Sequence, residues 1–320
     1  MRSKNVVFGC LAIPAALLLT GGLFVLVAWL KGPLPEIDHT GQQLEQTLPG
    51  SVARSVANPD STSEPSSVFD LDGATVLHVE LDLQDGEFDI SPGAFGGSIQ
   101  IDTDFPEGMY RLEPAWSERN GEPYFKLKFR GAGALQELQK VLHGQGHVDE
   151  PRLRVDLPKG VPMHLSLRVR KCAADIDLSG LSLLSLTFEH AMGSSQLVFR
   201  EANPVTMEMF DIRAKMGELE MDGLGNAAAR ELAFRGRMGD FRLDFDGEWR
   251  HDTIASIDMM MGSATVRIPR NVQLQHDNRH VLFGGIETPS RSRPRDPEQL
   301  ATQKSLVLST SVRFGDVTLR

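Results

Sequence analysis

The sequence is poor in cysteine and in positive charge, and it lacks the short motifs that mark common active sites. It contains only two cysteines, Cys10 and Cys172, in 320 residues, which is too few for a disulfide framework. The net charge of −10 argues against nucleic acid as a partner, because phosphates attract basic proteins. There is no GxSxG, P-loop, GxGxxG or CxxC motif, so nothing indicates a serine hydrolase, a nucleotide-binding protein or a thiol redox enzyme.

The composition is otherwise that of an ordinary globular protein. Hydrophobic residues make up 41% and charged residues 24% of the chain, which excludes collagen, a long coiled coil and wholesale disorder. A length of 320 residues fits about two domain-sized units or one large all-β unit.

The N-terminal segment predicts a membrane anchor. The stretch from Val6 to Leu30 contains no charged residue and is long enough to cross a bilayer as a helix. We therefore predict that residues 1–31 form a short cytoplasmic stub and one transmembrane helix, with residues 6–30 in contact with lipid. A cleaved signal peptide is the alternative, but its apolar region usually runs only about 7–15 residues.

Charge predicts the orientation of this anchor. Arg2 and Lys4 precede the span and only Lys31 follows it, which favours a cytoplasmic N-terminus and places the remaining chain in the periplasm or outside the cell. Residues 32–67 are rich in Pro, Ser, Thr and Gln and have little to bury, so we expect a flexible linker.

A repeat organises residues 68–320, the predicted ectodomain. Met-Gly recurs with its glycine at Gly193, Gly217, Gly239 and Gly262, at spacings of 24, 22 and 23 residues, and each copy is followed by a short alternating run. Related copies begin at Gly86, Ala174 and Gly315, which makes seven. Repeats of this length cannot bury an apolar face alone and must stack on their neighbours.

Alternation within the copies predicts strands. The second and fourth residues after the glycine are mostly apolar, as in Phe241 and Leu243, and a polar residue such as Arg242 lies between them. This period of two is typical of a strand with one buried face. The prediction is an all-β, stacked β-solenoid in which each repeat has a strand, a turn at the glycine and a second strand. A β-sandwich of hairpins is the alternative.

Two stretches break the repeat and are predicted insertions. Residues 104–150 contain an expected strand, Tyr124 to Phe129, and a short helix candidate, Ala134 to Leu142. Residues 287–304 have three prolines and no apolar pattern, so we expect an exposed excursion before the last copy.

Several segments together resemble a known family. The strand LPKGVP (Leu157–Pro162), the turn DLSGL (Asp177–Leu181) and the later GLGNA (Gly223–Ala227), DFDGEW (Asp244–Trp249) and GSATVRIP (Gly262–Pro269) are similar to the bacterial toast-rack family. That family is related to putative-adhesin domains of unknown function and to cell-wall-active-antibiotics response proteins. The resemblance covers about residues 150–285 and implies a membrane-linked β-solenoid of unknown biochemical role.

Histidine pairs are weak candidates for a metal site. His276 and His280 lie four residues apart, as do His143 and His147, which is the spacing of two zinc ligands on a helix. The first pair lacks the glutamate of an HExxH motif, and two glycines interrupt the second. Surface loops are the simpler interpretation.

Stacked acids are a second candidate. In the predicted register one column holds five acidic residues with Ser194 and Ser263 between them, and the next column holds three. The first column comprises Glu87, Asp175, Glu218, Asp240 and Asp316, and the second Asp89, Asp177 and Glu220. Neighbouring carboxylates repel, so either Ca²⁺ or water would have to relieve the repulsion. Catalysis of glycan cleavage would further need a cation beside the acids, and only Arg242, between Glu220 and Thr265, meets that condition.

The remaining candidates have simple structural explanations. Cys172 is expected to be a small, semi-buried residue near a turn, with no histidine to activate it. Met192, Met216, Met238 and Met261 are expected to stack as a column at the edge of the core, with a copper or oxidant-sensing role as a remote alternative.

From the sequence we therefore assign no catalytic residue, no metal and no cofactor. We predict a single-pass, membrane-anchored scaffold, adhesion or binding module of the cell envelope, with envelope proteins or glycans as partners. A polysaccharide-acting enzyme and an accessory sensor of envelope stress are the alternatives. A deep polar cleft that holds a cation opposite carboxylates would favour the enzyme.

Overall fold

The structure is a computed structural model that describes residues 67–69, 76–95, 97–105, 110–131, 150–288 and 303–320. The predicted membrane span, the linker up to residue 66, the helix candidate at 134–142 and most of the excursion at 287–304 lie outside these residues. Within them, no helix has the length and apolar character needed to span a membrane.

The described residues form an all-β structure, as predicted, with one short 3₁₀ helix, η1 (Leu224–Ala227). The strands are β1 (Ser67–Phe69), β2 (Leu77–Phe95), β3 (Ile99–Asp104), β4 (Tyr110–Arg119), β5 (Glu122–Gly131), β6 (Arg152–Lys159), β7 (Met163–Asp177), β8 (Leu183–His190), β9 (Gly193–Val198), β10 (Met207–Asp222), β11 (Ala229–Asp244), β12 (Thr253–Arg267), β13 (Gln273–Glu287) and β14 (Ser305–Leu319).

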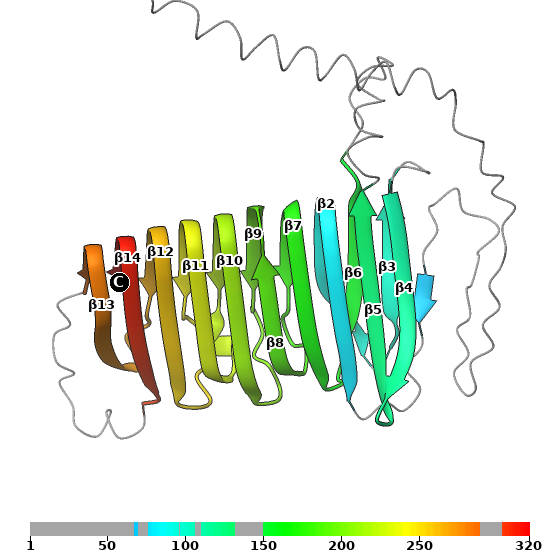
Figure 1. Ribbon diagram of the computed structural model, residues 1–320. Coiled ribbons are helices and arrows are strands. Elements are labelled where there is room, and N and C mark those ends of the chain that lie inside the picture. Colours follow the sequence, from blue (N-terminus) through cyan, green and yellow to red (C-terminus); the bar gives the residue numbers. More distant parts are fainter. Residues whose placement is uncertain (1–66, 70–75, 96, 106–109, 132–149, 289–302) are drawn as a thin grey trace, which may run out of the picture. The chain divides into compact units, whose positions relative to one another are not determined.

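Most of these strands stack in parallel, one repeat per layer (Figure 1). The order is β2, β7, β8 with β9, β10, β11, β12, β14 and β13, and we call each of these layers a rung. The pairs β10–β11, β11–β12 and β12–β14 are parallel and keep one continuous register. A solenoid requires this arrangement, whereas the hairpins of a β-sandwich would pair antiparallel.

Each rung bends at its glycine. We call this position the corner, the residues before it the first arm and the residues after it the second arm. Gly239 lies opposite Gly217 on one side and Gly262 on the other, so the predicted line of glycines is confirmed. The predicted turn between two strands is wrong for most rungs, because β10, β11, β12, β13 and β14 each continue through the corner as one bent strand.

Close packing of the rungs explains the glycine. Gly239 has a φ of +148°, and a Cβ atom there would overlap the carbonyl oxygen of Gly217. Gly262 stands in the same relation to Gly239, with a φ of +106°. A side chain at Gly239 or Gly262 would therefore have to push the neighbouring backbone away.

The predicted register of β7 is wrong by two residues. Cys172, not Ala174, lies opposite Gly86 and Gly193, so it occupies the corner of this rung. In this rung the positive φ is found one residue before the corner, since Lys171 has a φ of 49°. A shift of two residues preserves the inward and outward faces, which is why the alternation alone did not reveal it.

The sequence analysis missed an eighth copy. β13 carries it, with its corner at Gly284, opposite Gly315 of β14. β14 follows β13 in the chain but lies between β12 and β13, so chain order and rung order are inverted there (Figure 1). The terminal rung of the stack is therefore β13.

The N-terminal strands add an antiparallel part. β3 pairs antiparallel with β1 and β6, and β4 and β5 form an antiparallel hairpin. β5 runs parallel to the first arm of β2, and β6 runs parallel to its second arm. The strand predicted from Tyr124 to Phe129 is confirmed within β5.

The core lies between the arms and is built from the inward positions. Phe241 and Leu243 are buried, at 3% and 0% exposure, whereas the Arg242 side chain is 62% exposed, as the alternation predicted. Equivalent inward residues stack on the neighbouring rungs, for example Leu219 beside Phe241 and Val266 beside Leu243.

We expect Leu243→Ala to lower the free energy of unfolding by about 2–5 kcal/mol, because it leaves a cavity in a fully buried column. Arg242→Ala should leave the free energy of unfolding nearly unchanged, since its exposed ion pair with Glu220 is screened by water. Urea denaturation of the two variants measures the difference. Equal losses would contradict the alternation of faces.

We expect Gly239→Ala to destabilise the protein by clearly more than the roughly 1 kcal/mol typical of a Gly→Ala change in a strand. The added Cβ would meet the backbone of the preceding rung. Gly121, in the turn between β4 and β5, is the matched control, because it also has a positive φ but its Cβ would have nothing within 4 Å. Thermal denaturation that shows similar losses for both alanine variants would refute the packing explanation.

Candidate functional site

A half-open groove runs along the outer face of the second arms. It has a volume of about 580 Å³ and crosses β7, β9, β10, β11 and β12. Its floor includes buried residues such as Leu219 and Phe241, and its walls are polar. The outward side chains that line it are Asp175, Ser194, Gln196, Glu218, Glu220, Asp240, Arg242, Ser263 and Thr265.

The groove contains acidic groups without cationic partners. Asp240 accepts a hydrogen bond from Ser263 Oγ at 2.5 Å, and Arg242 Nη1 lies 2.6 Å from Glu220 Oε1. Neither Glu218 nor Asp240 forms an ion pair with another residue of the described part. The groove therefore presents negative charge together with hydroxyl and amide groups.

A second groove adjoins the first. It has a volume of about 470 Å³, shares Ala173 and Asp175 with the first groove, and continues over β2, β3 and β6. Two of its acids are paired, because Arg152 lies 2.7 Å from Glu87 and Arg154 lies 3.3 Å from Asp89, whereas Asp102 and Asp104 form no ion pair within the described residues. The two grooves together make one polar face with an excess of acidic side chains.

The geometry favours binding over acid–base catalysis. The predicted cation beside carboxylates is present, since Arg242 lies between Glu220 and Thr265. However, the side chains of Arg242 and Glu220 are 62% and 39% exposed and neutralise each other. A general acid is usually held protonated by burial or by a neighbouring like charge in a closed site, and this open pair offers neither.

The predicted acidic columns are only partly correct. Asp175 lies opposite Asp89 and Gln196 and therefore belongs to the second column, while Ala173 takes its place in the first. Asp177 shifts in the same way and lies opposite Val198. Both corrections follow from the corner at Cys172. Within the described residues no group of three or more His, Cys, Asp or Glu is arranged to hold a metal ion.

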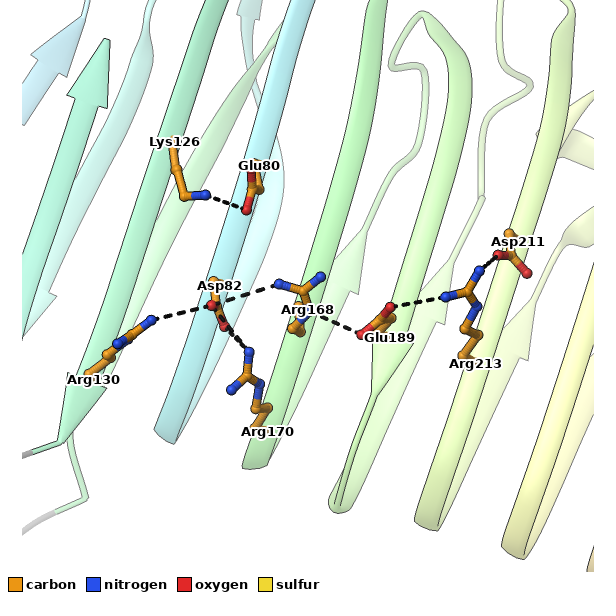
Figure 2. Close-up of polar contacts among 9 residues, drawn as sticks. All are labelled: Glu80, Asp82, Lys126, Arg130, Arg168, Arg170, Glu189, Asp211 and Arg213. Carbon is orange, nitrogen blue, oxygen red and sulfur yellow. Dashed lines mark hydrogen bonds and ion pairs between the residues drawn. The ribbon is translucent and has the colours of Figure 1, made fainter. Parts of the chain in front are cut away.

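The outer face of the first arms carries an ion-pair network that the sequence analysis did not find. Figure 2 shows Asp82 of β2 facing arginines from β5 and β7. Asp82 lies 3.0 Å from Arg170 and 3.8 Å from both Arg130 and Arg168, and its side chain is only 8% exposed. The three cations thus join the β4–β5 hairpin to the stack through one nearly buried carboxylate.

The network continues along the rungs. Arg168 lies 3.0 Å from Glu189, and Arg213 bridges Glu189 and Asp211 at 3.4 and 2.7 Å (Figure 2). Burial raises the pKa of Glu189, but the hydrogen bond and the charge of Arg168 outweigh it, so the pKa lies below its usual value. The pairs Arg168–Glu189 and Glu189–Arg213 connect successive rungs, and the charges of this face neutralise one another, so the network has a structural role. The register of the rungs, once known, would have revealed it.

The predicted histidine sites find no support in the described residues. His276 hydrogen-bonds Thr310 Oγ1 at 3.0 Å, and burial lowers its pKa. The side chain of His280 and both His143 and His147 lie outside the described residues. Cys172 lies at a corner, near a turn as expected, but it is buried and not semi-buried, and burial raises the pKa of its thiol to about 12.

The methionine column exists, but its predicted place at the edge of the core is wrong. Met216 lies opposite Met238, and Met238 lies opposite Met261. These three and Met192 are 43–44% exposed. The corner turns the residue before the glycine outward, so hydrophobicity alone misplaced it.

His190 is a buried group that the sequence analysis did not single out. It is fully buried beside Phe188, and neither ring nitrogen has a hydrogen-bond partner among the described residues. Burial lowers its pKa from 6.5 to about 4. The folded protein therefore holds it as a neutral imidazole.

We expect the free energy of unfolding to fall as the pH drops from about 6.5 to about 4. In this range His190 binds a proton in the unfolded chain but stays neutral in the folded protein. The loss attributable to this shift is about 3 kcal/mol. His190→Leu should remove this part of the pH dependence and raise stability at pH 7, since it removes two unpaired buried nitrogens. Urea titrations at several pH values compare the two proteins, and parallel pH profiles would contradict the assignment.

Comparison with known proteins gives a family but no activity. No curated protein matches the sequence. Among similar solved structures, a "putative cell adhesion protein" from Clostridium sporogenes is 11% identical, with a TM-score of 0.37, and the match covers 79% of this chain and 96% of that chain. A "putative adhesin" from Bacteroides fragilis is also 11% identical, with a TM-score of 0.35, and the match covers 81% of this chain and 98% of that chain.

A family model agrees with the resemblance seen in the sequence. Residues 57–217, half of the chain, match the family described as the N-terminal domain of toast_rack, DUF2154. The chain therefore belongs to the toast-rack family.

Proposed function

We propose that this protein is a membrane-anchored binding module of the bacterial cell envelope. Val6 to Leu30 holds the chain in the membrane, and the stacked rungs lie outside the cytoplasm. The acidic groove on the second arms is the ligand surface.

The groove is the observation that carries this proposal. It crosses five rungs, which corresponds to about 19 Å at a strand spacing of about 4.8 Å. Its walls repeat similar groups at that spacing, since Ser194, Glu218, Asp240 and Ser263 follow one another from rung to rung. A regular row of this kind suits an extended ligand with a repeating backbone.

The charge of the groove limits the chemistry of the ligand. Glu218 and Asp240 accept hydrogen bonds from hydroxyl and ammonium groups and repel phosphate, sulfate and carboxylate. The ligand is therefore an extended polymer that carries hydroxyls or amines, such as a glycan strand, and not a polyanion.

Membrane vesicles that carry the full chain test both parts of this proposal. After washes with high salt and carbonate the protein should remain in the vesicles and bind chitosan oligomers, but not polyglutamate. Glu218→Gln with Asp240→Asn should weaken chitosan binding at least fivefold, because two of the three groove carboxylates without an ion pair in the described part are lost. Glu231→Gln with Asp258→Asn, two exposed acids on the first arms of β11 and β12, is the control with the same change of charge.

Two outcomes would overturn the proposal separately. Release of a soluble chain that begins near residue 31 would refute the anchor. Equal chitosan binding by the groove variant and the unaltered chain would refute the groove as the ligand surface, whatever the location of the protein.

A further inference from the structure

The corners of six rungs form a line of exposed apolar side chains. Met238 pairs with Met216 and Met261, and Phe314 pairs with Met261 and Phe283. In Figure 1 the bends of β10, β11, β12 and β14 follow one another along the upper edge of the stack. We call this line the corner ridge, and it comprises Met192, Met216, Met238, Met261, Phe314 and Phe283.

The ridge is unusually exposed for its composition. The four methionines are 43–44% exposed, Phe314 is 47% and Phe283 is 67% exposed. Single exposed apolar residues are common on protein surfaces, but here they form a continuous row over six rungs, about 24 Å long. Because the row continues from methionine into phenylalanine, its shared property is apolarity and not the sulfur that a copper site would need.

Charged columns flank the ridge on both sides. On the first-arm side lie Lys215, Arg237 and Arg313, each one residue before the ridge. On the second-arm side lie Glu218, Asp240 and Asp316, each two residues after it. All six are exposed, and none forms an ion pair with another residue of the described part. One side of the ridge is therefore basic and the other acidic.

The charges are matched rung by rung. β10, β11 and β14 each carry a cation before the ridge and an acid after it. The other three rungs of the corner ridge carry neither, and there the flanking pairs are Ala191 and Ser194, Met260 and Ser263, and Leu282 and Gly285. A surface with this pattern is complementary to itself, because each rung offers both partners of an ion pair or none.

We propose that the corner ridge is the contact between two copies of this chain, related by a two-fold axis parallel to the ridge. That axis places the basic side of one copy against the acidic side of the other, so Arg237 of each copy meets the partner's Asp240. A two-fold axis perpendicular to the ridge would instead set the cations against one another. The charge pattern thus selects the arrangement in which both stacks run in the same direction.

The size of the ridge sets the strength of the contact. The ridge is about 24 Å long, and the three residues from the basic to the acidic column span about 10 Å. This area is well below the roughly 800 Å² per partner of a stable interface. The pair is therefore weak and is best trapped by cross-linking.

Disulfide trapping of the full chain in detergent tests the contact. Cys10→Ala and Cys172→Ala remove the native thiols, and a cysteine is then placed on the ridge at Met238 or, as a second site, at Phe314. Either cysteine should form a disulfide-linked dimer on mild oxidation. Ile254→Cys, which is 61% exposed on the first arm of β12, is the control that should stay monomeric.

Mixed cross-linking tests the direction. Met192→Cys should link to Met192→Cys, but not to Phe283→Cys, which lies about 24 Å farther along a parallel partner. Efficient linkage of Met192→Cys to Phe283→Cys would show antiparallel copies and overturn the proposal.

Charge reversal tests the complementarity. In the Met238→Cys background, an all-basic copy and an all-acidic copy should each lose at least tenfold in cross-linking yield, and a mixture of the two should recover it. The all-basic copy carries Glu218→Lys, Asp240→Arg and Asp316→Arg, and the all-acidic copy carries Lys215→Glu, Arg237→Asp and Arg313→Asp. Yields that do not depend on these charges would refute the proposal.

A lipid surface is the other occupant that the experiment detects. In that case Met238→Cys would stay monomeric, and phosphatidylglycerol vesicles would protect its thiol from a water-soluble maleimide. This result would overturn the proposed pair. The test uses no ligand of the groove, so its failure and the failure of the proposed function remain separate.

Discussion

The close approach of backbones at the corner is the constraint on which the rest of the structure depends. Gly239 and Gly262 each lie so near the carbonyl oxygen of the preceding rung that a Cβ atom would overlap it. This contact holds the corners of successive rungs in line. Once the corners are aligned, every position before and after them is aligned as well, because the strands are parallel and in register. The buried columns, the groove and the corner ridge all follow from this one alignment.

The periodicity of the sequence predicted the features of the fold that repeat in every rung. It could not predict features that do not depend on that periodicity. Alternation and the glycine spacing predicted the buried faces of Phe241 and Leu243 correctly. The corner at Cys172 was misplaced because the unusual φ lies on Lys171, and no glycine marks it. The inverted order of β13 and β14 could not be predicted either, since both carry valid repeats and the pattern within a rung does not encode which rung lies beside it.

The candidate site was predictable in part for the same reason. Stacked acids and the lone Arg242 were visible in the repeat, and the structure places most of them along one groove. The ion pairs of Asp82 were not found, because an insertion in the repeat separates Asp82 from Arg168 and Arg170 in the sequence. The exposure of the methionines was also missed. A hydrophobic side chain suggests burial, but the position of these methionines at the corner leaves their side chains exposed.

Because the rungs repeat, the residue type at one position of the repeat determines a surface that runs along the whole stack. A single exposed methionine or an unpaired surface charge has little effect on stability. In a parallel stack the same choice recurs at about 4.8 Å intervals, so it becomes a line. The charged side chains of the first arms, from Asp82 to Arg213, form ion pairs with one another, and these pairs join the rungs. Within the described residues the corner charges around Met238 and Phe314 form no ion pair, and on the six rungs of the corner ridge they are present or absent as matched pairs. A selection for stability alone would not require that matching, whereas a contact with another surface of the same period would.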